Sequence, residues 1–146
     1  YINFSPLPKK RKLIYTIDCP KEDIYAFVDE EALNKIFSNL YNNAIKFAIQ
    51  KVAIRLMPIQ KDATYCYIEF ENDGFKIPNE KREKIFEPFY RLNESKQEGT
   101  AIGLASARSL TALINGDLYL KETTDSSIIF VFCLPIQGQK ASAEKV

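Results

Sequence analysis

The chain has 146 residues, a length that fits one domain by the usual allowance of about 100–200 residues each. Hydrophobic residues make up 46% of the sequence, enough for a sizeable core, and the net charge of +1 argues against an electrostatic nucleic-acid binder. The sequence has no apolar run of about 18 residues and no signal-peptide pattern, so it predicts no transmembrane helix. Cys19, Cys66 and Cys133 are widely spaced and are expected to be reduced packing residues rather than metal ligands.

The first residues of the sequence are expected to form an extended linker that leads into the folded domain. Pro6 and Pro8 precede the basic run 9–12, which we interpret as a solvated segment rather than a localisation signal. We therefore expect a linker at 1–11, a single domain at 12–136, and a polar tail at 137–146.

Apolar periodicity predicts an interleaved series of strands and helices. The expected elements, in chain order, are strands at 12–18 and 24–29, a long helix at 30–49, strands at 51–58 and 64–71, a short helix at 79–85, a second long helix at 101–114, and a hairpin at 117–122 and 127–134. The second long helix should stop at Asn115-Gly116. This order lacks a strict βαβ rhythm and predicts an α/β (α+β) two-layer sandwich, with helices packed on one face of a mixed sheet.

The first long helix carries two stripes. Its apolar stripe consists of Leu33, Ile36, Phe37, Leu40, Ala44, Phe47 and Ala48. Asn39, Asn43 and Lys46 follow one another at intervals of four and three residues and form a polar stripe. Asparagine is a mediocre helix former, so this pattern suggests a function: an amide oxygen can ligate a hard cation, and an ammonium can meet a phosphate. An ordinary amphipathic helix is the alternative.

Three later segments add to this pattern. Residues 72–74, Asn-Asp-Gly, follow a strand, at a turn where the backbone can approach a ligand closely. Residues 85–91 form an aromatic cluster. Residues 99–105 are punctuated by glycine and open a helix, whose N-terminal N–H groups suit phosphate. Taken singly, these segments read as a hairpin turn, a hydrophobic plug and a flexible loop.

In this order and at this spacing, the four segments resemble the ATP-binding catalytic domain of two-component sensor histidine kinases. That domain has the Bergerat fold of the superfamily that includes DNA gyrase, the heat-shock chaperone ATPases and the MutL repair proteins. The segments that look like its asparagine box, first glycine box, phenylalanine box and second glycine box are residues 39–44, 72–78, 86–89 and 99–104. The resemblance covers residues 12–135.

The resemblance implies that ATP and Mg²⁺ bind here. Asn43 would ligate Mg²⁺ with Asn39 supporting it, and Lys46 would meet phosphate oxygens. The residues that would wrap the triphosphate are Gly99, Thr100, Ala101, Ile102, Gly103 and Leu104. Arg91 would reach the outer phosphates from a short polar lid at 90–98, which is expected to become ordered when nucleotide binds.

The resemblance also implies a site for the adenine base. Asn72 replaces the family's aspartate, and its amide oxygen would accept a hydrogen bond from the adenine amino group, about half as strongly as a carboxylate would. Asp73 is the alternative acceptor if the register shifts by one residue. Phe47 would pack near the adenine, Gly74 would let the backbone approach the base, and Ile77 would wall the pocket.

Two further positions depart from the family pattern. Lys76 stands where a second glycine is common, and Ala101 replaces a glycine of the phosphate loop. Alanine does not readily adopt positive φ, so the loop either avoids that conformation at 101 or carries strain there. Together with Asn72, these substitutions leave catalytic competence open.

The chain contains no histidine. The resemblance implies transfer of the γ-phosphoryl group to a histidine on a separate helical dimerisation domain, with residues 1–11 as the remnant of the connection. It also implies a response regulator receiver domain as partner, a homodimer in the full-length protein, no nucleic-acid partner, and a cytoplasmic location within a membrane-bound sensor. The general base is not assigned; the candidates are Asp29, Glu30 and Glu31.

Two alternatives keep the same pocket. The chain could be a degenerate, non-catalytic module that binds nucleotide or a partner protein, which the three substitutions favour. It could also be an anti-sigma-type protein serine kinase. The intact set of Asn39, Asn43, Lys46, Gly99 and Gly103 favours a kinase.

Overall fold

A computed structural model describes residues 12–21, 23–88, 100–121 and 127–136 of the chain. Its elements are β1 (Ile14–Asp18), α1 (Glu30–Phe47), β2 (Lys51–Leu56), β3 (Tyr65–Asn72), the 3₁₀ turns η1 (Asn79–Lys81) and η2 (Lys84–Phe86), α2 (Thr100–Leu113), β4 (Asp117–Leu120) and β5 (Ile128–Pro135). No helix within these described ranges is long and apolar enough to cross a membrane.

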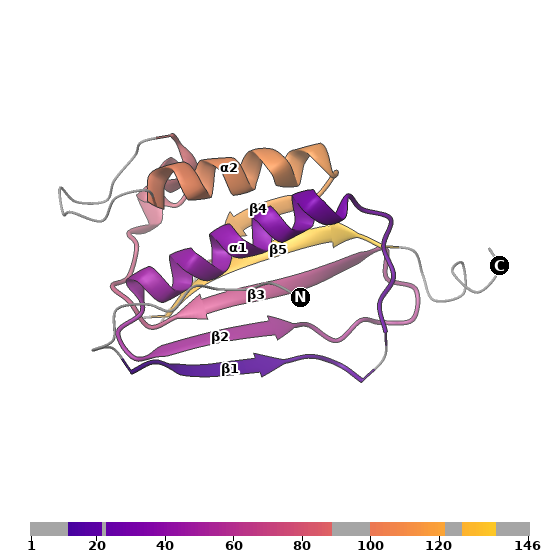
Figure 1. Cartoon of the computed structure of the whole chain (residues 1–146), viewed down its shortest axis with the longest axis horizontal. Helices are drawn as coiled ribbons and strands as arrows, with labels where there is room; N and C mark the ends of the chain where they lie inside the picture. Colours follow the sequence, from indigo (N-terminus) through magenta and orange to yellow (C-terminus); the bar gives the residue numbers. More distant parts are fainter. Residues whose placement is uncertain (1–11, 22, 89–99, 122–126, 137–146) are drawn as a thin grey trace.

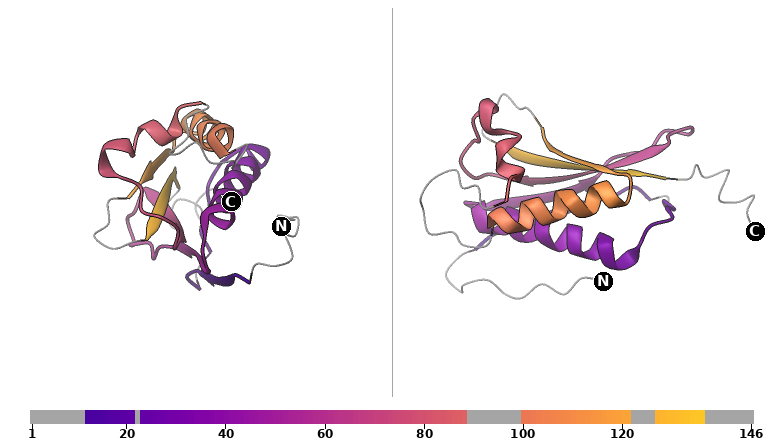
Figure 2. Two further views of the ribbon diagram at one scale, coloured as in Figure 1. Left: turned by 90° about the vertical axis from the view of Figure 1, so that its left-hand side faces the viewer. Right: turned by 90° about the horizontal axis from the view of Figure 1, so that it is seen from above.

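The strands form one mixed sheet in the order β1-β2-β3-β5-β4 (Figure 1). β1 pairs with β2 in parallel, and the other neighbours are antiparallel. Both long helices pack on the same face of this sheet and run antiparallel to each other, as the two rotated views make clear (Figure 2). The expectation of a two-layer sandwich with a mixed sheet is confirmed.

The core lies between the helices and the sheet. Ile36 and Leu40 of α1 are almost fully buried, as are Leu118 of β4 and Phe132 of β5. Phe37 meets the ring of Phe132 edge to face, with ring centroids 5.4 Å apart. The apolar stripe predicted for residues 33–48 therefore packs against the sheet, and this leaves the asparagines to be explained separately.

The ends of the helices are set by local chemistry. The Asp29 carboxylate caps α1 by accepting a hydrogen bond from the Glu31 N–H at 3.0 Å. After α2, Asn115 adopts a positive φ of 64° and the Gly116 N–H bonds back to the Thr111 carbonyl at 2.9 Å. This reversal is a Schellman-type helix ending, so the predicted stop at Asn115-Gly116 is confirmed.

Two predicted elements differ from the structure. Residues 24–29 are in neither a strand nor a helix, although Ile24, Ala26 and Val28 pack against the core while Tyr25 and Phe27 are exposed. The alternation of apolar residues predicted correctly which side chains face inward, but the segment is not part of the sheet formed by the described strands. The predicted short helix at 79–85 is instead η1 and η2, two separate 3₁₀ turns. The remaining predicted strands and helices are present, with ends shifted by a few residues.

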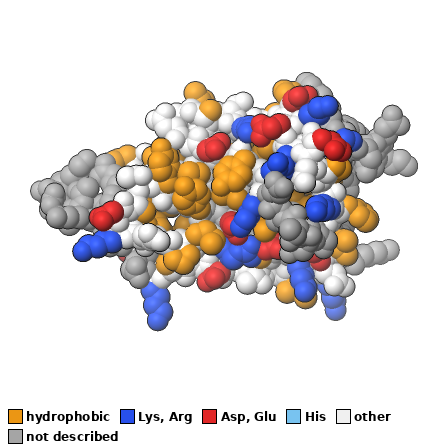
Figure 3. Space-filling model, turned by 180° about the vertical axis from the view of Figure 1, so that it is seen from behind, with side chains coloured by type: hydrophobic (Ala, Val, Ile, Leu, Met, Phe, Trp, Pro, Cys, Tyr) orange, Lys and Arg blue, Asp and Glu red, His pale blue; other side chains and the backbone are white. Residues whose placement is uncertain are grey.

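Neither of the two long helices packs on the opposite face of the sheet (Figures 1 and 2), which Figure 3 shows from behind. Apolar and charged side chains share this face; among them Tyr65 and Tyr67 are exposed and Glu69 is buried. Arg55 and Lys121 both pair with the Glu69 carboxylate, at 3.0 and 3.1 Å. Burial acts to raise the pKa of Glu69, but the hydrogen bonds from the two cations outweigh it and hold the pKa below its ordinary value.

Candidate functional site

Three elements that carry predicted ATP-binding residues meet at one end of the sandwich. There α1 ends, β3 leaves the sheet, and α2 begins (Figure 1). Because the two helices are antiparallel, the N-terminus of α2 lies at the same end as the last turn of α1. Unpaired N–H groups and the positive end of the α2 dipole therefore belong to this end of the fold, an arrangement that favours anions.

The polar stripe of α1 is partly buried, and Asn39 within it lies beside α2. Asn43 is only 6% exposed, and its Oδ1 has no hydrogen-bond partner within the described part of the chain. Asn39, one turn earlier, is half-buried beside α2: a Cβ at Gly103 would lie 3.9 Å from the Asn39 Oδ1. Two motifs more than sixty residues apart in sequence thus meet across the two helices. Lys46 and Phe47 occupy the last turn of α1 and are half-buried.

The turn after β3 closes against the end of α1. Asn72 is 1% exposed, and its Oδ1 accepts a hydrogen bond from the Gly74 N–H at 2.8 Å. The Asn72 Nδ2 has no partner among the described residues. A Cβ at Gly74 would come within 2.4 Å of the Phe47 carbonyl oxygen, so only glycine fits there. The sequence predicted a close backbone approach at Gly74; the structure shows that the approach is to α1.

The Asp73 side chain, unlike that of Asn72, binds the backbone that follows α1. Its carboxylate accepts hydrogen bonds from the backbone N–H groups of Ile49, Gln50 and Lys51, at 2.8 to 3.1 Å. Burial acts to raise the pKa of Asp73, but these bonds outweigh it and lower the pKa below its ordinary value. Of the two residues between which the sequence left the register open, Asp73 is bound to the backbone and Asn72 carries the buried, unpartnered atom.

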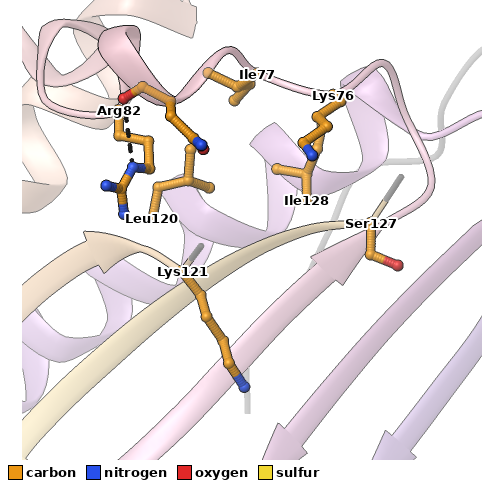
Figure 4. Close-up of a pocket in the computed structure, with 8 residues that line it drawn as sticks. Lys76, Ile77, Arg82, Leu120, Lys121, Ser127 and Ile128 are labelled. Atoms are coloured by element: carbon orange, nitrogen blue, oxygen red, sulfur yellow. Dashed lines mark hydrogen bonds between the residues drawn. The ribbon is translucent and has the colours of Figure 1, made fainter. Parts of the chain in front are cut away.

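Ile77 is buried and belongs to the core. It also contributes to a small pocket between the segment after β3 and the ends of β4 and β5 (Figure 4). Lys76, Arg82 and Lys121 are its basic lining residues, and Arg82 donates a hydrogen bond from Nε to the Asn79 carbonyl at 3.4 Å. Neither Asn43 nor Asn72 lines this pocket.

The phenylalanine box contributes a buried anchor. Phe86 packs edge to face on Phe130, and the Arg108 guanidinium carbon lies 4.2 Å from the Phe86 ring centroid. Arg108 also makes two hydrogen bonds to the Glu83 carboxylate, at 2.8 and 3.2 Å. Sequence reasoning missed Arg108, because a lone arginine on a helix reads as a solvated side chain; only the fold brings it to η2.

Other predicted residues lie elsewhere. Asp29, Glu30 and Glu31 begin α1, and Asn43 lies about 20 Å further along the helix axis at 1.5 Å per residue. The structure thus does not bring these base candidates to the site, and Asp29 serves as a cap. Leu104 is buried in the core.

Part of the predicted phosphate site lies in residues that the structure does not describe. Arg91, Gly99 and the predicted lid at 90–98 lie outside the described residues. The backbone of Thr100, Ala101 and Ile102 forms the first turn of α2.

A metal ion would need oxygens from a ligand in addition to those of the protein. The described residues include no group of three or more His, Cys, Asp or Glu side chains able to hold one. The buried and unpartnered amide oxygen of Asn43 is nevertheless the hard donor that Mg²⁺ accepts, and Mg²⁺ in nucleotide sites usually combines one or two protein oxygens with phosphates. The residues present therefore fit a Mg²⁺ ion that arrives with a nucleotide.

Two curated sensor proteins are similar to the chain over most of its length. The sensor protein VanSC of Enterococcus gallinarum is 33% identical over 135 residues, which is 90% of this chain and 36% of that protein. The swarming motility regulation sensor protein RssA of Serratia marcescens is 36% identical over 115 residues, 78% of this chain and 24% of that protein. The chain thus spans about a third or less of the length of these relatives.

A solved structure and a family match agree with this similarity. The catalytic domain of histidine kinase ThkA superposes with a TM-score of 0.73 at 25% identity, covering 88% of this chain and 82% of that one. Residues 28–138 match the family described as histidine kinase-, DNA gyrase B- and HSP90-like ATPases. The chain belongs to this ATPase family, as an ATP-binding catalytic domain of the sensor histidine kinase type.

Proposed function

We propose that this domain binds Mg·ATP between α1, α2 and the turn after β3, and presents the γ-phosphoryl group to a histidine on a separate helical domain. The observation that carries the proposal is the pair of buried asparagines, Asn43 and Asn72, each with one polar atom that no described residue satisfies. Such atoms are uncommon in native proteins and call for a ligand, ion or water.

The proposed phosphate site uses the facing ends of the two helices. Asn43 ligates Mg²⁺, Asn39 supports it, and Lys46 contacts phosphate oxygens. Residues 99–104 wrap the triphosphate, and Arg91 reaches its outer phosphates from the lid. Bound Mg²⁺ would neutralise charge on the phosphates, and the protein would contribute mainly position and electrostatics, as is usual in phosphoryl transfer.

The proposed base site lies at the turn after β3. Asn72 contacts the edge of the purine, Gly74 keeps the turn close to the end of α1, and Phe47 and Ile77 supply apolar walls. The burial of Asn72 and the commitment of Asp73 to the backbone at 49–51 both support Asn72 as the residue that reads the base.

The proposed partners follow from the kind of domain. A helical dimerisation domain supplies the acceptor histidine, a response regulator receives the phosphoryl group, and the full-length protein works as a homodimer whose catalytic domain lies on the cytoplasmic side of a membrane. The chain's lack of histidine requires that the acceptor be elsewhere.

A second candidate is a module that binds nucleotide without transferring phosphate. The replacement of the family's charged aspartate by the neutral Asn72 favours it, because the loss of the charge weakens a hydrogen bond from the adenine amino group. The two candidates differ in phosphotransfer and share nucleotide binding.

The metal assignment is tested by comparing Asn43→Ala with Asn42→Ala, its exposed neighbour on α1. Asn43→Ala should weaken Mg·ATP binding by about tenfold or more, equivalent to about 1.4 kcal/mol, and leave metal-free adenosine binding nearly unchanged. Asn42→Ala should bind both ligands as the wild type does. Titration calorimetry with and without Mg²⁺ measures this. An equal loss for both ligands in Asn43→Ala would indicate a structural role for Asn43.

A further inference from the structure

The carboxamide of Asn72 has a fixed orientation. Its Oδ1 lies 2.8 Å from the Gly74 nitrogen, and a backbone N–H can only donate. The oxygen must therefore be the end that faces Gly74, and the NH₂ group must point the other way. This assignment follows from the hydrogen bond and does not depend on distinguishing nitrogen from oxygen by shape.

Rotating the amide by 180° is unfavourable. It would place the NH₂ group against the Gly74 N–H, so that two donors would meet at hydrogen-bond distance in a side chain that is only 1% exposed. A buried donor without an acceptor is strongly disfavoured. The close approach of Gly74 to the Phe47 carbonyl oxygen holds the turn in place, so the turn has little freedom to relieve such a clash.

An aspartate at this position would behave differently. A carboxylate has an acceptor oxygen on both sides, so one oxygen takes the Gly74 N–H and the other accepts from a ligand. The Asn72 oxygen also accepts the hydrogen bond from the Gly74 N–H, but the other end of the amide is Nδ2, a donor that has no partner among the described residues. Asn72 therefore offers a ligand a donor. The replacement of aspartate by asparagine thus presents a ligand with a hydrogen-bond donor instead of an acceptor, and it also removes a negative charge.

We infer that Asn72 shifts base selection away from adenine and towards 6-oxopurine nucleotides, whose ring carries a carbonyl acceptor where adenine carries an amino donor. This inference rests on the proposed function, in which Asn72 reads the base. Adenine can still meet Nδ2 through its N1 acceptor, but its amino group then lies beside a donor. ATP therefore binds less well than its oxo counterpart, without being excluded.

The test compares the dissociation constants of ATP and inosine triphosphate, which differ at the 6-position and the adjoining N1. Calorimetry on the wild-type chain with Mg²⁺ should give tighter binding of inosine triphosphate than of ATP. Asn72→Asp should shift the ratio of the two constants towards ATP by about tenfold or more, because its outer oxygen accepts from the amino group. The added negative charge weakens both triphosphates alike and cancels in the ratio.

Asn42→Asp is the matched control, because it adds the same charge at an exposed position on α1 and should leave the ratio as in the wild type. Repeating the measurement with adenosine and inosine removes any contribution of metal and phosphates. Tighter ATP binding by the wild type, with a ratio that Asn72→Asp leaves unchanged, overturns the inference and leaves the proposed function standing. If the wild type binds none of these ligands, both fail. If Asn72→Asp does not fold, the wild-type preference alone decides.

Discussion

The Asp73 carboxylate accepts hydrogen bonds from three consecutive backbone N–H groups where α1 gives way to β2. These N–H groups follow a helix that has ended, and nothing in regular secondary structure would otherwise use all of them. One side chain thus joins the exits of α1 and β3, the two elements that carry Asn43 and Asn72. Its contribution to the site is indirect: it fixes the distance between elements.

Asp73→Asn should lower the free energy of unfolding by about 1–2 kcal/mol, because a neutral amide oxygen replaces a charged acceptor of several N–H groups. Urea denaturation of the two proteins at neutral pH measures the difference. If Asp73 acted only on nucleotide, the unfolding curves would coincide.

The pH dependence provides a separate check. The folded pKa of Asp73 is depressed, so its stabilisation is fully present above the ordinary aspartate pKa and is lost as the pH falls through the folded pKa. Between neutral pH and about pH 3, Asp73→Asn should therefore lose less stability than the wild type. A steeper acid loss in the variant would contradict this assignment.

The sequence predicted that Asn72 and Asp73 lie together at the turn after β3, but it did not predict how their hydrogen bonding differs. Asn72 and Asp73 are adjacent and chemically alike, and either could have read the base. The pleat of β3 separates their positions, because Asn72 falls on the same face as the buried Phe70 and Asp73 is the first residue beyond the strand. Sequence alone does not give the register of a strand end to one residue.

At the scale of elements, two glycines have opposite roles. Gly74→Ala should destabilise the fold by about 1–3 kcal/mol, because the new Cβ would lie 2.4 Å from the Phe47 carbonyl oxygen. Gly103→Ala places its Cβ no closer than 3.9 Å to the atoms around it, within a helix that favours alanine, and should stabilise by about 0.5–1 kcal/mol. Thermal unfolding of both variants tests the contrast. Similar shifts of the same sign would show that close approach does not set the role of Gly74.

Arg108 connects α2 to the 3₁₀ turns through Glu83 and the Phe86 ring. Arg108→Ala should speed amide hydrogen exchange across 79–86 and lower stability by about 1 kcal/mol, since the ion pair is partly exposed. Lys84→Ala, which removes an exposed cation from η2, is the control and should leave exchange nearly unchanged. Equal acceleration in both variants would mean that net charge, and not the Arg108 contacts, holds this segment.

Elements with their own periodicity were predictable, and those fixed by distant partners were not. α1 and α2 have long apolar stripes and chemical stop signals, and their prediction is confirmed to within a few residues. Residues 24–29 alternate like a strand but do not join the sheet of described strands, and the segment at 79–86 forms two turns around the Arg108 contacts. Strand pairing and contacts with distant side chains are tertiary interactions, and the local sequence pattern does not determine them.

At the scale of the whole molecule, the site is assembled from the ends of elements. α1 provides the asparagine stripe, β3 provides Asn72 at its last residue, and α2 begins beside them. A rigid sheet and two antiparallel helices therefore hold polar groups that are far apart in sequence. In the proposed function this arrangement binds the nucleotide, and the acceptor histidine lies on another domain, because the chain has no histidine.

The isolated chain incubated with Mg·ATP should therefore acquire no phosphohistidine. Adding a helical domain that bears an acceptor histidine should yield phosphate on that domain alone, stable to base and labile to acid. Asn43→Ala should reduce this transfer by about tenfold or more, since positioning of the triphosphate limits the rate, whereas Asn42→Ala should not. Radiolabelled ATP followed by acid and base treatment of each separated chain measures it. Because the chain has no histidine, acid-labile phosphate on this chain itself would have to sit on a carboxylate, a lysine or an arginine, and would overturn transfer to a separate domain as its mechanism.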